Sequence, residues 1–146
     1  MRIQFEQVSR MIDTIRLPER ATQYSAGYDF FAPEDITLPA KSLTRVMTGV
    51  KCELVPSVCI ILANRSSNPS KKNLFLANGV GVIDADYYNN PENEGEIGFE
   101  FYNNSDEDVK IEKNEKIGQG IIMHWVRTDD DNATGSRDGG FGSTGK

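Results

Sequence analysis

The chain has 146 residues, enough for one domain with a hydrophobic core and too few for two. Its formal charge of −6 argues against general nucleic-acid binding, which needs a basic face, and no apolar run approaches the roughly 20 residues that span a bilayer. The first residues contain no uninterrupted apolar stretch of the kind found in secretory signals, so we expect a cytoplasmic protein.

Short strands dominate the elements that the sequence predicts. Gly and Pro recur often, and branched or aromatic residues fill the stretches between them. The predicted elements are strands at 44–50 and 57–62, a short helix at 68–72, and strands at 95–102 and 116–126. In the third strand Ile97, Phe99 and Phe101 alternate with Glu or Gly, which predicts one buried face. Many short strands and little helix favour an all-β sandwich, barrel or jelly roll.

The last 20 residues differ in kind from the rest. From Arg127 to Lys146 the chain is polar, rich in Gly and Asp, and holds one aromatic residue. Composition alone predicts a mobile tail here. We therefore expect one β domain over 1–126 and a separate segment over 127–146.

The cysteines and the histidine carry little chemistry in this reading. Cys52 and Cys59 lie in apolar surroundings, which predicts two buried free thiols. Without a CxxC motif or a Cys/His cluster a zinc site is not expected. His124 is the only histidine, which excludes HExxH metal sites, and we interpret it as a residue on a strand face.

Five short polar or Gly-rich segments stand out together, although each is weak alone. In chain order they are 25–29 (SAGYD), 64–67 (NRSS), 78–87 (NGVGVIDADY), 118–120 (GQG) and 139–145 (GGFGSTG). In this order they resemble the five motifs of the trimeric dUTPase family, and the resemblance runs from Leu17 to Lys146. It implies a distorted jelly-roll β-barrel with a mobile C-terminal arm, in a bacterial or phage protein. It also implies a homotrimer whose three active sites each combine motifs from all three chains.

The resemblance also implies the reaction, hydrolysis of dUTP to dUMP and pyrophosphate. Asp84 matches the catalytic aspartate, which orients and deprotonates a water that attacks the α-phosphorus. Asn78, Val82 and Ile83 belong to a segment expected to form a β-hairpin whose backbone reads uracil. Hydrogen bonding can reject cytosine by about 10^4 to 10^5, whereas thymine must be rejected sterically. Tyr87 would pack under the deoxyribose and exclude a 2′-hydroxyl.

Other matches are assigned to the triphosphate and its metal. The guanidinium, hydroxyls and amides of Arg65, Ser66 and Ser67 suit phosphate oxygens, and Gln119 is expected to reach the same region. Asp29 matches an aspartate that holds Mg2+ through bound waters. Because Mg2+ keeps several waters and takes other ligands from phosphates, we expect no direct protein ligand to the metal.

The tail is expected to complete the site by closing over an active site of the trimer. Phe141 would stack over uracil, while Gly142, Ser143 and Thr144 would hold the γ-phosphate, and such closure excludes water. Arg137 is expected nearby. It lies one residue closer to Phe141 than the arginine of many relatives, so the motif supports its role at the γ-phosphate less strongly than the roles of Ser143 and Thr144.

The segment Tyr88–Glu94, called the insertion below, lengthens a turn that many family members keep shorter. Its Asn, Pro and Gly residues predict a neutral surface loop, and the alternative is a contact with a neighbouring site or a partner protein. A regulatory protein of the phage type on the same fold is therefore an alternative function. The related deoxycytidine triphosphate deaminases use a glutamate in place of the Asp-Ala-Asp-Tyr pattern that ends at Tyr87, which disfavours that activity.

Overall fold

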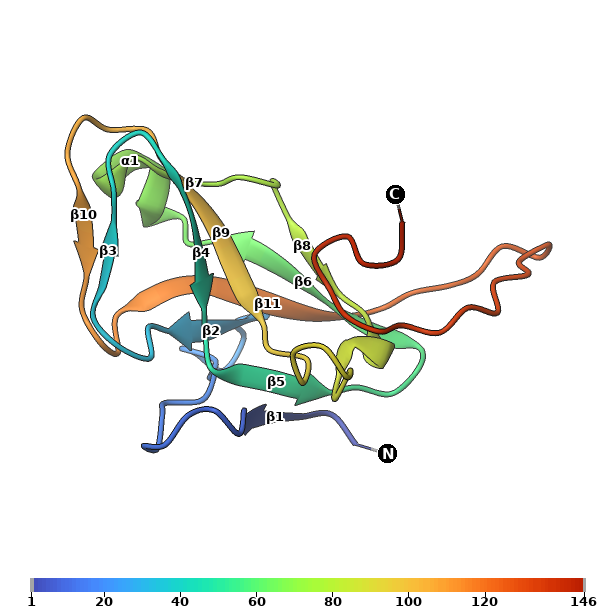
Figure 1. The fold of residues 1–146 in the computed structure, drawn as a ribbon. Coiled ribbons are helices and arrows are strands. Elements are labelled where there is room, and N and C mark those ends of the chain that lie inside the picture. Colours follow the sequence, from blue (N-terminus) through green and yellow to red (C-terminus); the bar gives the residue numbers. More distant parts are fainter. Residues whose placement is uncertain (1, 146) are drawn as a thin grey trace.

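Strands make up most of the ordered elements, as predicted. The computed structural model describes residues 2–145, so Met1 and Lys146, the outer ends of the two predicted segments, lie outside the described residues. No helix within residues 2–145 is long and apolar enough to cross a membrane. The strands are β1 (Gln4–Gln7), β2 (Gly27–Phe31), β3 (Ile36–Leu38), β4 (Leu43–Met47), β5 (Val50–Glu53), β6 (Val58–Asn64), β7 (Leu74–Leu76), β8 (Gly81–Ile83), β9 (Gly98–Asn103), β10 (Val109–Ile111) and β11 (Lys116–His124); the helices are α1 (Ser67–Lys72) and the 3₁₀ helix η1 (Ala85–Tyr87) (Figure 1).

These strands form four antiparallel sheets. The largest has the order β2-β11-β6-β8, and the next has the order β4-β9-β7. Two further pairs, β1 with β5 and β10 with β3, flank them. The predicted all-β class is confirmed. The pairing among the described residues leaves these sheets open, so the closed barrel implied by the resemblance stays a prediction.

The core lies between the two larger sheets. Phe30 of β2 and Phe99 of β9 meet edge to face with ring centroids 5.3 Å apart, and Phe101 stacks on Phe99 at 6.1 Å. Ile97, Phe99 and Phe101 are all at most 1% exposed, which confirms the predicted buried face. Fully burying an apolar side chain of this size contributes about 1.5–3 kcal/mol, so this alternation is a main source of contact between the sheets.

The strand predicted over 44–50 is wrong as a single element. β4 ends at Met47 and β5 begins at Val50, and the two belong to different sheets. Gly49 between them has φ +75°, a conformation that glycine adopts at little cost. Its N–H donates to a carboxylate oxygen of the buried Glu96 at 2.9 Å, which fixes the turn. A local sequence pattern cannot show this change of sheet.

The remaining predictions of local structure hold with small shifts at the ends. The predicted helix at 68–72 lies within α1, which ends at Asn73 in a left-handed conformation. Cys52 and Cys59 are buried and free, as predicted, and burial raises the pKa of both thiols, that of Cys52 to about 12. His124 ends β11 on its exposed side. Neither thiol is thus a ready nucleophile at neutral pH.

Candidate active site

A pocket of about 320 Å³ opens where β8 passes into η1. Its size is in the range of small-ligand sites. Nine residues assigned from the resemblance line it: Asn78, Val82, Ile83, Asp84, Tyr87, Arg137, Phe141, Gly142 and Thr144. The structure therefore brings the 78–87 motif and the tail motif together in one chain.

The segment from Asn78 to Tyr87 is not the hairpin that was expected. β8 pairs with β6, with Ile83 opposite Ile60, and the chain then turns at Asp84 into η1. β8 has only three residues, so its position is fixed by pairing with β6, a strand that lies far from it in the sequence. Asn78, in the turn before β8, and Tyr87, at the end of η1, still line the same pocket. The expected proximity is present, but another topology produces it.

Asp84 lies at the junction of β8 and η1 with an extended backbone, and its side chain is about half exposed (48%). The guanidinium of Arg137 donates to Asp84 Oδ2 at 2.6 Å and to Asp86 Oδ1 at 2.8 Å. Charge-assisted bonds of this length are strong. One tail arginine thus bridges the two carboxylates of the motif, instead of lying free beside the pocket.

Tyr87 forms a buried wall of the pocket, with 6% of the residue exposed. Its hydroxyl donates to the backbone carbonyl of Glu96 at 2.5 Å and accepts from Asn93 Nδ2 at 2.9 Å. Burial raises the pKa of this phenol, so it stays neutral and able to donate at physiological pH. Both hydrogen bonds act at the tip of the ring and fix its orientation.

The tail loops out beyond Val126 and then returns along η1 and β8 of its own chain (Figure 1). The ring of Phe141 lies under the guanidinium of Arg45, 3.7 Å from centroid to Cζ. Gly140 rests against Tyr87 so closely that an added Cβ would be 2.4 Å from the ring. The tail therefore packs on a surface formed by β4, β9 and η1.

A second group of assigned residues lies elsewhere, on β2, β6 and β11. Asp29 is opposite Gln119 in the β2–β11 pair, and its carboxylate meets Lys116 Nζ at 3.2 Å. Arg65, just after β6, donates to the Lys116 carbonyl at 3.4 Å. Gln119 Nε2 donates to the Asn64 carbonyl at 3.4 Å. These side chains form a polar cluster that does not line the Asp84 pocket.

Asp84 and Arg65 lie near opposite ends of β6, and the pocket lining extends along the strand as far as Leu62. Cys59 lies near the start of β6, where burial, and after it the charge of the nearby Asp84, raises the pKa of its thiol. Arg65 follows the last residue of β6, six residues on, which is roughly 20 Å along a strand. Ser66 and Ser67 begin α1 at this same far end, and Ser143 is exposed outside the pocket lining.

The pocket also contains residues that the sequence reading did not select. They are Leu62 and Gly98, with Arg45 above Phe141. Gly98 lies on the strand face opposite Ile97 and Phe99, and a glycine there leaves room beside Phe141; the alternation could have indicated it. Arg45 carries no comparable signal, because only tertiary structure brings β4 under the tail.

Comparison with known proteins assigns this arrangement to a family. The dUTPase family profile matches residues 13–145. The chain belongs to the dUTPase family. The deoxyuridine 5′-triphosphate nucleotidohydrolase of Lactococcus lactis is 44% identical over 133 residues, which covers 90% of this chain and 89% of that protein.

Solved structures of dUTPases have the same fold. The crystal structure of the Streptococcus mutans dUTPase superposes with a TM-score of 0.82 at 42% identity, covering 86% of this chain and 98% of that one. The dUTPase of phage phi11 of S. aureus, described for its species-specific insert, superposes with a TM-score of 0.74 at 21% identity, over 91% and 96% of the two chains. The second likeness concerns the fold alone.

Proposed function

We propose that this dUTPase hydrolyses dUTP to dUMP and pyrophosphate, which keeps uracil out of DNA and supplies dUMP for dTMP synthesis. The match to the Lactococcus lactis nucleotidohydrolase supports the substrate. The observation that carries the proposal is a half-exposed carboxylate, Asp84, at the mouth of a pocket whose wall is the buried ring of Tyr87. A carboxylate that can act as a general base, beside an aromatic ring that can pack against a sugar, suits a deoxynucleotide.

In the proposed reaction Asp84 orients a water and accepts its proton as the oxygen attacks the α-phosphorus in line. Arg137 occupies Asp84 Oδ2, an oxygen that the water would need, so in this proposal the guanidinium first leaves Asp84. The entering triphosphate offers oxygens of the same charge and geometry, to which the guanidinium can transfer. Arg137 thereby links nucleotide entry to release of the base.

The uracil ring is recognised, in this proposal, by the free edge of β8. β8 is the last strand of its sheet, and it pairs with β6 on one side only. The backbone groups on its other side are therefore available for the polar edge of uracil, as in strand-edge recognition of other ligands. Phe141 from the tail would cover the base, and Tyr87 would lie under the sugar.

The polar cluster fits a hydrated Mg2+ bound with the phosphates. Within residues 2–145 no group of three or more His, Cys, Asp or Glu side chains could hold a metal directly. Asp29 offers a partly exposed carboxylate whose ion pair with Lys116 a cation can replace. Oxygen donors reached through water suit Mg2+, which when bound neutralises charge on the phosphate oxygens. Arg65, Ser66, Ser67 and Gln119 would contact the phosphates at this cluster.

A homotrimer would bring the two ends of β6 together between chains. In one chain Asp84 and Arg65 lie roughly 20 Å apart along β6, too far to serve the same phosphorus. Placing the polar cluster of one copy at the pocket of the next supplies the missing phosphate contacts. The 127–146 arm, which lies on its own chain here, would close over an active site of that trimer.

The test is turnover of dUTP beside dCTP, dTTP and UTP, with Mg2+ and again with a chelator. We expect hydrolysis of dUTP alone at appreciable rate, and its loss on chelation with the oligomer intact. Dissociation or unfolding on chelation would make the metal structural and contradict the assignment of Asp29. Binding of dUTP without turnover would favour the regulatory alternative.

A further inference from the structure

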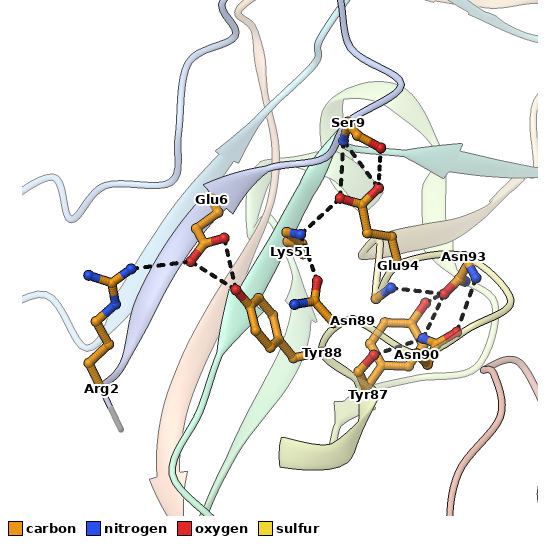
Figure 2. Close-up of polar contacts among 11 residues, drawn as sticks. Arg2, Glu6, Ser9, Lys51, Tyr87, Tyr88, Asn89, Asn90, Asn93 and Glu94 are labelled. Carbon is orange, nitrogen blue, oxygen red and sulfur yellow. Dashed lines mark hydrogen bonds and ion pairs between the residues drawn. The ribbon is translucent and has the colours of Figure 1, made fainter.

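The insertion folds into a compact loop directly behind Tyr87 (Figure 2). Its ends are joined by backbone bonds between Asn89 and Glu94 at 2.9 Å and between Glu94 and Asn90 at 3.0 Å. Asn90 is 5% exposed, and its side-chain oxygen accepts from two backbone N–H groups within the loop. A neutral surface loop does not need a buried asparagine, so the insertion has internal order of its own.

The outer side of the insertion is tied to β1 and β5. Glu94 bonds Lys51 Nζ at 2.8 Å and the hydroxyl of Ser9 at 2.6 Å. Lys51 also donates to Asn89 Oδ1 at 2.7 Å, and the hydroxyl of Tyr88 donates to the Glu6 carboxylate at 2.9 Å. These contacts, all visible in Figure 2, hold the loop against a two-stranded sheet that takes no part in the pocket.

The inner side of the insertion holds Tyr87. Asn93 Nδ2 donates to the Tyr87 hydroxyl at 2.9 Å, and Asn90 Nδ2 donates to the Tyr87 carbonyl at 2.7 Å. The Asn93 side-chain oxygen accepts from Asn90 Nδ2 at 2.8 Å and from the Gly95 N–H at 3.1 Å. The Asn93 side-chain oxygen thus fixes the residue within the loop, and its amide nitrogen holds the Tyr87 ring.

The same loop contacts the tail. The Glu92 N–H donates to the Asp138 carbonyl at 3.2 Å, and the Glu92 side chain lies where a Cβ on Gly139 would be. Asp138 follows Arg137, the residue that pairs with Asp84. The insertion therefore supports the site at two points, the tyrosine ring and the base of the returning tail.

We propose that the insertion is a positioning element of the active site, in which Asn93 fixes the Tyr87 ring so that ribonucleotides are rejected. This rests on the proposed function, which places Tyr87 under the deoxyribose. A 2′-hydroxyl adds only one oxygen, so rejecting it requires a wall that does not yield by a fraction of an ångström. Bonds to both the tip and the backbone of Tyr87 provide that stiffness. Asn93 does not line the pocket, and it acts through Tyr87.

The decisive variant is Asn93→Asp. It keeps the oxygen that accepts from Asn90 and Gly95 and replaces only the donor to Tyr87. We expect the ratio of kcat/KM for dUTP over UTP to fall about three- to tenfold, the usual worth of one hydrogen bond, mainly through faster UTP turnover. The dUTP over dCTP ratio should stay unchanged, because the base is read elsewhere. Tyr87→Phe, which keeps the ring but removes both hydrogen bonds at its tip, should shift the sugar ratio in the same direction.

The control is Ser9→Ala, which removes a bond to Glu94 on the outer side and leaves Asn93 and Tyr87 untouched. It should lower the melting temperature slightly, because the Ser9 backbone N–H still bonds Glu94, and leave both ratios as in wild type. An unchanged dUTP over UTP ratio in Asn93→Asp and Tyr87→Phe would overturn the inference. So would an equal loss in Ser9→Ala, which would reduce the effect to stability. A wild-type protein inactive on dUTP would instead defeat the proposed function.

Discussion

The two ends of β6 differ in what they have already assembled. At the Cys59 end a single chain closes a pocket around Asp84, with a buried tyrosine, a supporting loop and its own tail. At the Arg65 end the chain presents Asp29, Lys116 and Gln119 on neighbouring strands outside that pocket. In the proposed reaction, one chain would therefore form the nucleoside half of a site, and another copy would supply the phosphate half.

Charge sharpens the same contrast. At the pocket end two carboxylates, Asp84 and Asp86, share one guanidinium, so negative side chains outnumber the cation that pairs with them. At the other end Arg65 and Lys116 accompany the carboxylate of Asp29. A triphosphate needs the cations of the Arg65 end close to the pocket, and the proposed trimer with its Mg2+ would bring them there.

The largest effect should come from Asp84→Asn at the pocket end. The amide keeps the shape of the side chain and cannot accept the proton, so kcat should fall by at least about 10^2 to 10^4. Binding of dUTP, measured by calorimetry, should persist. Near-native kcat in this variant would remove Asp84 from the role of base.

The next effect is a recovery of activity in mixed oligomers. Asp84→Asn and Arg65→Ala should each be weakly active, because each lacks one half of the site. If the halves come from different chains, mixing the two variants should restore about a quarter of the sites, since random assembly pairs each intact half with that frequency. Native mass spectrometry would verify mixed oligomers, and their inactivity would show that one chain builds the whole site.

The same mixing experiment locates the arm. Protein truncated after Thr134 should fold, since the removed segment buries little, and should be inactive alone. The structure places the arm on its own chain's pocket, whereas the resemblance implies a contribution from all three chains. Recovery with Asp84→Asn would show that the arm crosses to another chain in the trimer, and failure would keep it on its own.

The smallest effect concerns the outer anchor of the pocket end. Hydrogen bonds from Lys51 first, and then Ser9, lower the pKa of Glu94 to about 2. A lowered folded-state pKa stabilises the fold above about pH 4.5, and that contribution is lost as the pH falls through about 2. Glu94→Gln should therefore reduce the melting temperature modestly at pH 7, and the difference from wild type should shrink between these two values. A constant difference from pH 7 to 2 would contradict this.

Much of the fold follows from local pattern, and the exceptions have a common cause. The alternation at Ile97, Phe99 and Phe101 predicted a buried face because period two is a property of a strand alone. The strands β3, β7 and β10 have three residues each, too few for a period to show, and none was predicted. Pairing of β8 with β6 likewise depends on residues some 20 positions away, which is why the expected hairpin was wrong.

The site divides in the same way. The nine assigned residues around the pocket were selected by a motif resemblance, and the structure brings them together. The contact of Arg137 with Asp84, the place of Arg45 and the inward bonds of Asn90 and Asn93 could not be read from the sequence. Asparagine and arginine side chains are commonly exposed to solvent, so the sequence does not show which of them make buried contacts.

The two glycines that seat the tail set limits on how the protein can vary. At Gly140 a methyl group would strike the Tyr87 ring, and at Gly139 it would meet Glu92, whereas Gly145 faces open space. A substitution should therefore be costliest at Gly140, where the obstacle is a buried ring, cheaper at Gly139, where the Glu92 side chain can move, and cheapest at Gly145. Gly145 is consequently the natural attachment point for a fluorophore that reports arm movement without blocking it.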